Sequence, residues 1–142
     1  QKDFDPNRRN RLGFALSDIT QHLPGAFLIY KADPENDQIL FANQELVTYA
    51  GCKDLDEFMQ YSKHSFRNLI RSDEQEAVEK SIWQQIRSQA AGTNDFVQFH
   101  FVKKDGSTHP VLDHGRIVES NYYGNVFYVL IMDCQLLDEH YD

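Results

Sequence analysis

The side chains best suited to chemistry lie close together in the last third of the chain: His109, Asp113 and His114. A histidine beside a carboxylate can act as a general base, and two histidines near a carboxylate can hold a metal ion. If the segment is a strand, His109 and Asp113 face one side, while His114, an odd number of residues from His109, faces the other. Unless Pro110 introduces a bulge, this parity argues against a histidine pair on one metal. We expect surface or edge-strand histidines, no metal site and no enzyme, and keep catalysis by His109 with Asp113 as the least favoured hypothesis.

The cysteines and the charge of the chain bound its setting. Cys52 and Cys134 form no CxxC motif, which argues against a disulfide framework or a zinc site and suits a reducing compartment, so we expect a cytoplasmic protein. The sequence has 14 Lys and Arg against 22 Asp and Glu, a net charge of −8, and its basic residues are scattered. Such a surface repels phosphate backbones and anionic lipids, and no apolar run approaches the ~18 residues of a membrane span. We therefore expect neither nucleic acid nor a membrane as a partner.

A chain of 142 residues with 41% hydrophobic and 13% aromatic residues can bury the core of one ordinary domain. Its first helix, predicted over residues 8–21, carries apolar side chains at helical spacing and stops before Pro24. Leu12, Leu16 and Ile19 belong to this N-terminal stripe. Such an amphipathic helix packs either on its own domain or against the same helix of a second chain, and the spacing leaves both arrangements open.

The pattern after this helix predicts an α+β fold. Turn residues separate five β-prone segments, and the tight turn at Asp105 and Gly106 joins two of them, so the strands form one five-stranded antiparallel sheet. A helical insert lies between the second and third strands. The predicted strands span residues 26–31, 38–42, 96–102, 108–118 and 126–132.

Short helices and one long helix make up the predicted insert. Asn43 caps the first short helix and Asp54 the second, because each has a side-chain oxygen for the free N–H groups of a first turn. The long helix starts at Ser72 or Asp73, each followed three positions later by Gln or Glu, and it ends before Gly92. Its apolar face has to cover one side of the sheet.

Several short motifs follow one another in a distinctive order along these elements. They are residues 23–27 at the start of the first strand, 41–43 at the end of the second, 49–51 after the first short helix, 66–73 before the long helix, 103–107 in a hairpin, 113–116 and 128–133. Together they resemble the PAS sensor domain, of the PAS_3-like kind that carries a PAC segment and belongs to bacterial multidomain signalling proteins. Three positions depart from the resemblance: Arg71 begins a segment where relatives often have His-Pro-Asp, His109 stands where many have Trp, and Cys134 follows Asp133 where they have Ile-Thr.

The resemblance implies a sensory module. It divides the chain into an N-terminal amphipathic helix or linker at residues 1–22, a PAS domain at 23–137 and the start of a C-terminal linker at 138–142. The module would bind a small ligand or a partner and relay a conformational signal to a covalently linked output domain, a diguanylate cyclase or a histidine kinase. The alternative is a ligand-free module that forms a homodimer through the N-terminal stripe and holds output domains in register.

The resemblance also places candidate site residues. Relatives that bind ligands do so between the inner face of the sheet and the helical insert, where aromatic side chains gather and either line a pocket or fill the core. The pocket candidates are Phe66, Trp83, Phe99 and Phe101, with His114 or Tyr128 as a polar contact. Asp133, which ends the last strand, is the expected pivot of the signal, because its carboxylate can cap the helix that follows.

The resemblance assigns no cofactor. Light-sensing relatives carry a reactive cysteine shortly before the long helix, where this chain has residues 64–69 without one, and Cys52 comes too early. Haem-binding relatives supply a histidine from the long helix, which contains none in this sequence. Flavin photoadduct chemistry and haem ligation through that helix are therefore disfavoured.

Overall fold

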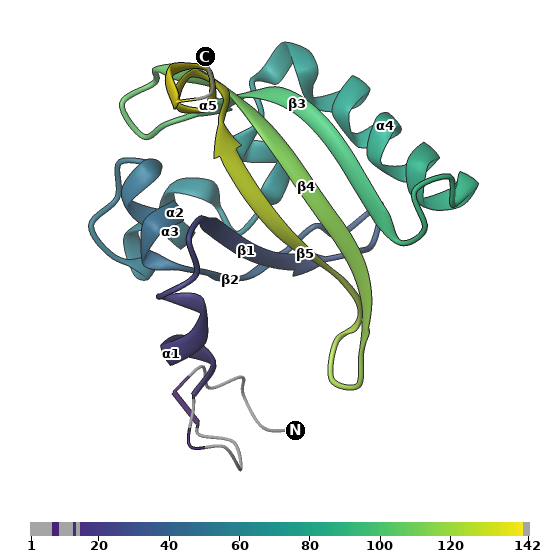
Figure 1. Ribbon diagram of the computed structural model, residues 1–142, viewed down its shortest axis with the longest axis horizontal. Helices are drawn as coiled ribbons and strands as arrows, with labels where there is room; N and C mark the ends of the chain where they lie inside the picture. The colour runs from purple at the N-terminus through teal and green to yellow at the C-terminus, as the bar shows by residue number, and fades with distance from the viewer. Residues whose placement is uncertain (1–6, 9–12, 14, 141–142) are drawn as a thin grey trace.

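The structure is a computed structural model that describes residues 7, 8, 13 and 15–140 (Figure 1). Along the chain the elements are α1 (Leu16–Thr20), β1 (Ala26–Lys31), β2 (Ile39–Ala42), α2 (Gln44–Tyr49), α3 (Leu55–Ser62), the 3₁₀ turns η1 (Phe66–Leu69) and η2 (Ser72–Glu74), α4 (Gln75–Ser88), β3 (Asn94–Val102), β4 (Thr108–Ser120), β5 (Gly124–Asp133) and α5 (Cys134–His140). Within the described part of the chain the strands form one antiparallel five-stranded sheet, in the order β2-β1-β5-β4-β3. The predicted α+β class and the helical insert between the second and third strands are confirmed.

The strand register decides which side chains face the helices. β3 and β4 pair without interruption, and Pro110 lies directly opposite His100 without a bulge. His109 and Asp113 therefore point to the inner face, and His114 lies on the outer face, as the alternation predicts.

The last three strands are longer than predicted. β3 begins at Asn94, and the ladder between β4 and β5 continues to Ser120, which pairs with Gly124. Polar residues in these segments indicate loops, but the pairing with a neighbouring strand outweighs the propensity of single residues. The β3–β4 turn is at the predicted place, where Gly106 has a φ of 87° and donates its N–H to the Lys103 carbonyl at 2.9 Å.

The inner face of the sheet carries the main hydrophobic core, which residues of α2, α3 and α4 complete. Alternate strand residues point into it, for example Leu28 in β1 and Phe101 in β3, both fully buried. Each such side chain contributes about 1.5–3 kcal/mol when it leaves water. A smaller cluster lies on the outer face and consists of Phe27, Ile29, Phe41 and Val126. The central strands are thus apolar on both faces.

The N-terminal helix is shorter than the one predicted over residues 8–21. Gly13 has a φ of 85°, a left-handed conformation that interrupts a right-handed helix, and α1 begins only at Leu16. The Asp18 carboxylate accepts the Ala15 N–H at 2.9 Å, which satisfies a backbone donor at this later start. The predicted stripe therefore does not run along one continuous helix.

Asn43 joins the N-terminal segment, β1 and α2 through one buried amide. Its Oδ1 accepts the N–H of Leu46 at 3.1 Å, which caps α2 as predicted, and the N–H of Phe27 at 3.0 Å. Its Nδ2 donates to the carbonyls of Thr20 and Gly25, both at 2.9 Å. The side chain is fully buried, so these four hydrogen bonds are made where water does not compete for them.

Asp54 is the N-cap of α3, also as predicted. Its carboxylate accepts the Glu57 N–H at 2.9 Å, and the Glu57 carboxylate in turn accepts the Lys53 N–H at 2.9 Å. Two backbone donors at the start of the helix are satisfied in this way.

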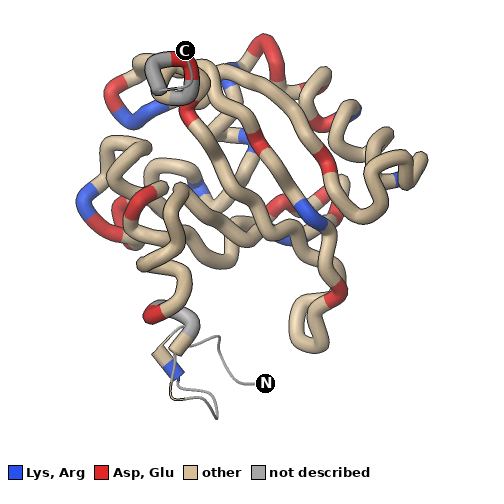
Figure 2. The backbone as a smooth tube through the Cα atoms, viewed as in Figure 1, with Lys and Arg blue, Asp and Glu red and all other residues tan. Residues whose placement is uncertain are grey.

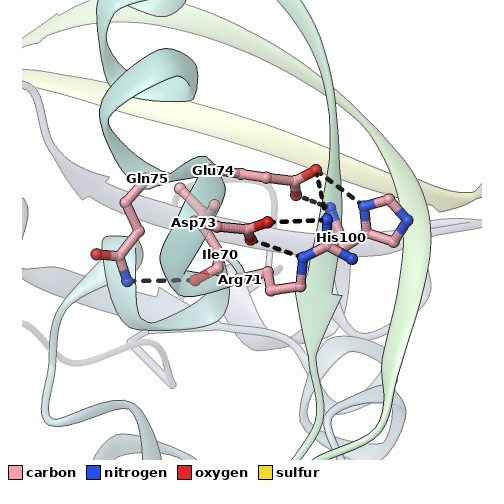
Figure 3. Close-up of polar contacts among 6 residues, drawn as sticks. All are labelled: Ile70, Arg71, Asp73, Glu74, Gln75 and His100. Atoms are coloured by element: carbon pink, nitrogen blue, oxygen red, sulfur yellow. Dashed lines mark hydrogen bonds and ion pairs between the residues drawn. The ribbon is translucent and has the colours of Figure 1, made fainter.

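The long helix α4 starts later than predicted, because the residues before it form a polar junction with β3 (Figure 3). The Glu74 carboxylate accepts the His100 backbone N–H at 2.7 Å and lies 3.0 Å from His100 Nδ1. Arg71 contacts Asp73 at 2.7 Å and Glu74 at 3.4 Å, so this segment forms the tight turn η2. Burial raises the pKa of Glu74, but the hydrogen bonds with His100 and the nearby Arg71 together lower it by more, and the net shift is downward.

α4 also ends before the predicted Gly92. Gln89 is left-handed, with a φ of 55°, and its N–H donates to the Gln85 carbonyl at 3.1 Å. The side chain of Gln85 accepts the Phe96 N–H and donates to the Phe96 carbonyl, each at 2.9 Å. Contacts with β3 therefore fix α4 near both of its ends.

Candidate functional site

Asp133 lies where β5, α2 and α5 meet. The Tyr49 hydroxyl, at the end of α2, donates to Asp133 Oδ2 at 2.7 Å. The other oxygen, Oδ1, accepts the backbone N–H groups of Gln135 at 2.8 Å and Leu136 at 3.3 Å, which caps α5. The Asp133 side chain is only 9% exposed, so it is not a free carboxylate at a strand end. We call this arrangement the Tyr49–Asp133 junction.

Tyr49 extends the junction into the sheet. Its ring meets Phe101 edge-on at 5.2 Å, and Lys103 Nζ lies 4.3 Å from its centre. His109 Nδ1 lies 3.9 Å from Asp133 Oδ2. Burial and the adjacent carboxylate raise the pKa of the Tyr49 hydroxyl. Burial also raises the pKa of Asp133, but the hydrogen bonds that it accepts and the neighbouring His109 together lower that pKa by more. The tyrosine is therefore the donor and the carboxylate the acceptor at neutral pH.

Four of the predicted pocket residues lie together between the sheet and the helical insert: Phe66, Trp83, Phe99 and Phe101. Phe66 stacks on Tyr30 with ring centres 4.2 Å apart and meets Phe99 edge-on at 6.1 Å. The hollow lined by Tyr30, Phe66 and Trp83 measures about 20 Å³, which is room for about one water molecule. Side chains therefore fill this part of the core.

The other two predicted pocket residues, His114 and Tyr128, lie on the outer face of the sheet. His114 stacks on Phe96 with ring centres 4.4 Å apart, and its Nε2 lies 3.0 Å from Asn94 Oδ1. Tyr128 meets Phe27 edge-on at 5.9 Å. The expectation that these two supply a polar contact to the inner aromatic group is corrected, because each follows an inward-facing residue of its strand and so points the other way.

A larger hollow, which sequence reasoning missed, lies beside the Tyr49–Asp133 junction. It measures about 690 Å³ and is lined by the start of β1, by α2, by the end of β5 and by Leu136 of α5. Half-exposed apolar side chains near it form what we call the outer apolar face: Phe96, Tyr128, Leu130, Met132 and Leu136. The available signal was the run at residues 126–132, which is apolar at every position and indicates a strand that is covered on both faces.

The predicted dimerisation residues are only partly described. Ile19, in α1, is exposed. Leu12 and the side chain of Leu16 lie outside the described residues. No described helix is long and apolar enough to cross a bilayer.

Metal-ligating and thiol side chains are dispersed over the fold. Among residues 7, 8, 13 and 15–140, no three His, Cys, Asp or Glu side chains are grouped so that they could hold a metal ion. Cys52 is buried, and burial raises the pKa of its thiol, which lowers its reactivity. Lys and Arg positions are spread over several described elements and are not gathered on one (Figure 2).

Known proteins share this architecture. The family model described as PAS fold matches residues 39–131. Among solved structures, the PAS domain of an HTR-like protein from Haloarcula marismortui has a TM-score of 0.61 and 17% identity, over 83% of this chain and 88% of that one. A PAS domain from Desulfitobacterium hafniense has a TM-score of 0.59 and 16% identity, over 80% of this chain and 95% of that one.

A third solved structure, a PAS domain from a two-component sensor histidine kinase, has a TM-score of 0.62 and 12% identity, over 83% of this chain and 92% of that one. No curated protein matches the sequence. Identities this low establish a shared fold, whereas the family match covers well over half of the chain. It includes β2, the whole helical insert and nearly all of the last three strands, so the chain belongs to the PAS family of sensory domains.

Proposed function

We propose that this PAS domain is the regulatory module of a cytoplasmic multidomain signalling protein and relays a conformational signal through α5 to a C-terminal output domain. The Tyr49–Asp133 junction carries the proposal, because one carboxylate both binds α2 and caps α5. A change in packing that moves Tyr49 alters the cap and so shifts the population of α5 conformations. By resemblance, the output domain is a diguanylate cyclase or a histidine kinase.

The proposed input is a small ligand in the 690 Å³ hollow. Tyr49, Asp133 and Leu136 line that hollow, so an occupant would contact the junction and α5 together. Its wall combines exposed apolar side chains with a few polar groups, among them His114. This composition fits a mainly apolar ligand with one polar end.

The relay is tested by removing one hydroxyl. Tyr49→Phe is expected to increase the hydrogen-exchange rates of the Gln135 and Leu136 amides about fivefold, because a hydrogen bond contributes about 1 kcal/mol. NMR of the whole chain measures both amides. Tyr61→Phe is the matched control, since the Tyr61 hydroxyl donates to the Val102 carbonyl at 2.7 Å, away from α5. Equal exchange rates in the two variants would show that α2 is not coupled to α5 through this contact.

The outer apolar face favours a second candidate function, ligand-free dimerisation that holds output domains in register. Its five side chains are each roughly half exposed, and contiguous exposed apolar surface commonly marks an interface. The proposed partner is a second copy of the chain, because two identical faces can pair about a twofold axis. Ile19 is the described part of the N-terminal stripe that could join this contact.

Native mass spectrometry of the purified chain, compared with its denatured mass, separates the two functions. Dimerisation predicts a dimer that Leu130→Asp converts to a monomer, because the substitution places a charge in the contact. If Ile19→Asp does so instead, the contact lies at α1. A ligand sensor predicts a small additional mass that leaves on denaturation. A monomer at micromolar concentration would contradict dimerisation.

A further inference from the structure

Asp95 of β3 and Asp113 of β4 are buried, and most of their carboxylate oxygens have no hydrogen-bond partner among the described residues. Each residue is 1% exposed. Both oxygens of Asp113 and Oδ2 of Asp95 lack a hydrogen-bond partner among the described residues. Buried carboxylates are normally paired with a cation or with donors, because a bare charge loses its hydration in an apolar core. The two side chains therefore require an explanation beyond packing.

The strand register brings these carboxyl groups together on the inner face. Asp95 pairs with Gly115, and Asp113 pairs with Val97, so the two aspartates are diagonal neighbours on adjacent strands. A Cβ atom at Gly115 would overlap the Asp95 carboxylate. The Asp95 carboxyl group thus occupies the space that a side chain at position 115 would fill. Figure 2 shows acidic positions within both strands.

None of the described groups that face the pair carries a positive charge. From β1, the buried Tyr30 hydroxyl faces the pair. Burial is the main cause that raises its pKa, and the negative charges of Asp113, Asp95, Asp37 in the β1–β2 loop and Glu79 in α4 raise it further. From β5, the residues opposite Asp113 and Gly115 are Ile131 and Val129, which do not titrate. No described cation therefore compensates the pair.

Two ionised carboxylates on diagonal positions of adjacent strands would repel each other in an apolar core. Burial raises the pKa of Asp95 to about 7. Burial, together with the charge of Asp95, raises the pKa of Asp113 well above its usual range. The favoured state near neutral pH is a pair that retains at least one proton, as in other close carboxyl pairs.

The pair lies beside the strand segment that holds the end of α4. Phe96, which follows Asp95, is bonded to Gln85 of α4 through both of its backbone groups. Trp83, two residues earlier in α4 and the only tryptophan of the chain, packs edge-on against Phe127 at 5.5 Å. A charge that opens the core near Asp95 would disturb both contacts.

We propose that Asp95 and Asp113 form a proton-sensing pair: a retained proton keeps α4 seated on the sheet, and its loss to water loosens that contact. No other bond has to form or break in this step. The proton is then an input that requires no bound ligand. The proposal goes beyond the relay through α5, and each can fail without the other, because the titration concerns α4 and β3.

The direction of the pH dependence follows from the raised pKa values. In the unfolded chain both carboxyl groups titrate near pH 4, at about their ordinary pKa. Between about pH 4 and about pH 7 the folded chain therefore holds more protons than the unfolded chain. The stability due to the pair is fully present below about pH 4 and is lost as the pH rises through the folded-state pKa values.

The proposal is tested by urea unfolding of the whole chain, which measures the free energy of unfolding at several pH values between about 5 and about 8.5. For each proton that the folded chain retains and the unfolded chain has lost, the folding equilibrium constant falls about tenfold for every unit by which the pH rises. A variant that lacks the pair does not show this decrease. The double variant Asp95→Asn with Asp113→Asn should lose this slope. Trp83 emission should shift to longer wavelength as the pH rises in the unsubstituted chain but not in the double variant. Asp56→Asn, at an exposed position, is the control and should keep both effects. If the free energy of unfolding has the same pH dependence in the unsubstituted chain and in the double variant, the proposal is overturned.

A second measurement needs no variant and decides the matter if the asparagine pair fails to fold. NMR of the aspartate carboxyl carbons should show at least one carboxyl group that is still protonated at about pH 5, where an ordinary aspartate is mostly ionised. Ionisation of every aspartate by that pH would overturn the proposal.

Discussion

Asn43→Ala is expected to lower the free energy of unfolding by about 3–5 kcal/mol, measured by urea denaturation. The substitution removes the cap of α2 and four buried hydrogen bonds of the amide, which join it to the N–H groups of Leu46 and Phe27 and to the carbonyls of Thr20 and Gly25. A buried group without a partner costs about 1–3 kcal/mol, and a lost N-cap costs about 1 kcal/mol. The total is below the full sum because some of these groups can shift or admit water.

The matched control for this variant is Asn36→Ala. Asn36 is exposed, and its side chain accepts a single N–H, that of Gln38, at 3.3 Å. This control is expected to change stability by less than about 0.5 kcal/mol. If Asn43→Ala also costs less than about 1 kcal/mol, the buried amide is not the connection between α1, β1 and α2 that the structure indicates.

Phe66→Ala is expected to cost about 3–5 kcal/mol and to create an internal binding site. Phe66 is buried between Tyr30 and Phe99, so truncation adds the volume of a ring to a hollow that now measures about 20 Å³. Charged side chains such as Asp37 and Glu79 line one side of this hollow, but the new space lies between the rings of Tyr30 and Phe99. An apolar space of that kind accepts benzene. Urea denaturation with and without benzene should show that benzene restores part of the lost stability, because it binds only the folded chain.

Phe96→Ala is the control for this second variant. Phe96 lies on the outer apolar face and is about half exposed, so its loss should cost less than about 1 kcal/mol and give no response to benzene. A folded Phe66→Ala variant that benzene does not stabilise would mean that the core collapses around the missing ring. The filled core would then not be convertible into a pocket.

The parts of the fold that depend on local chemistry were predictable from the sequence. Asn43 and Asp54 cap their helices because a short polar side chain satisfies N–H groups within one turn, whatever lies around it. The opposite faces of His109 and His114 follow from strand alternation alone. The cap that Asp133 provides for α5 is equally local.

The parts that depend on distant residues were not predictable. The start of α4 is set by Glu74 of η2, whose carboxylate accepts the backbone N–H of His100 in β3. The partner of Asp133 in the helical insert, Tyr49, is separated from it by most of the domain. The carboxyl pair was missed because Asp95 precedes the predicted strand 96–102, and its burial requires the exact register that places it over Gly115.

The central position of β1 and β5 has a mechanical consequence. The two strands are antiparallel neighbours, and Ala26 at the start of β1 pairs with Ile131 near the end of β5. The chain therefore enters and leaves the sheet at the same end of one ladder, while α1 and α5 continue from there in different directions (Figure 1). Tension applied to the two flanking segments would open this ladder one pair after another from that end, instead of shearing all of its pairs at once. The sheet would therefore separate under a lower pulling force than if all hydrogen bonds of the ladder had to break together.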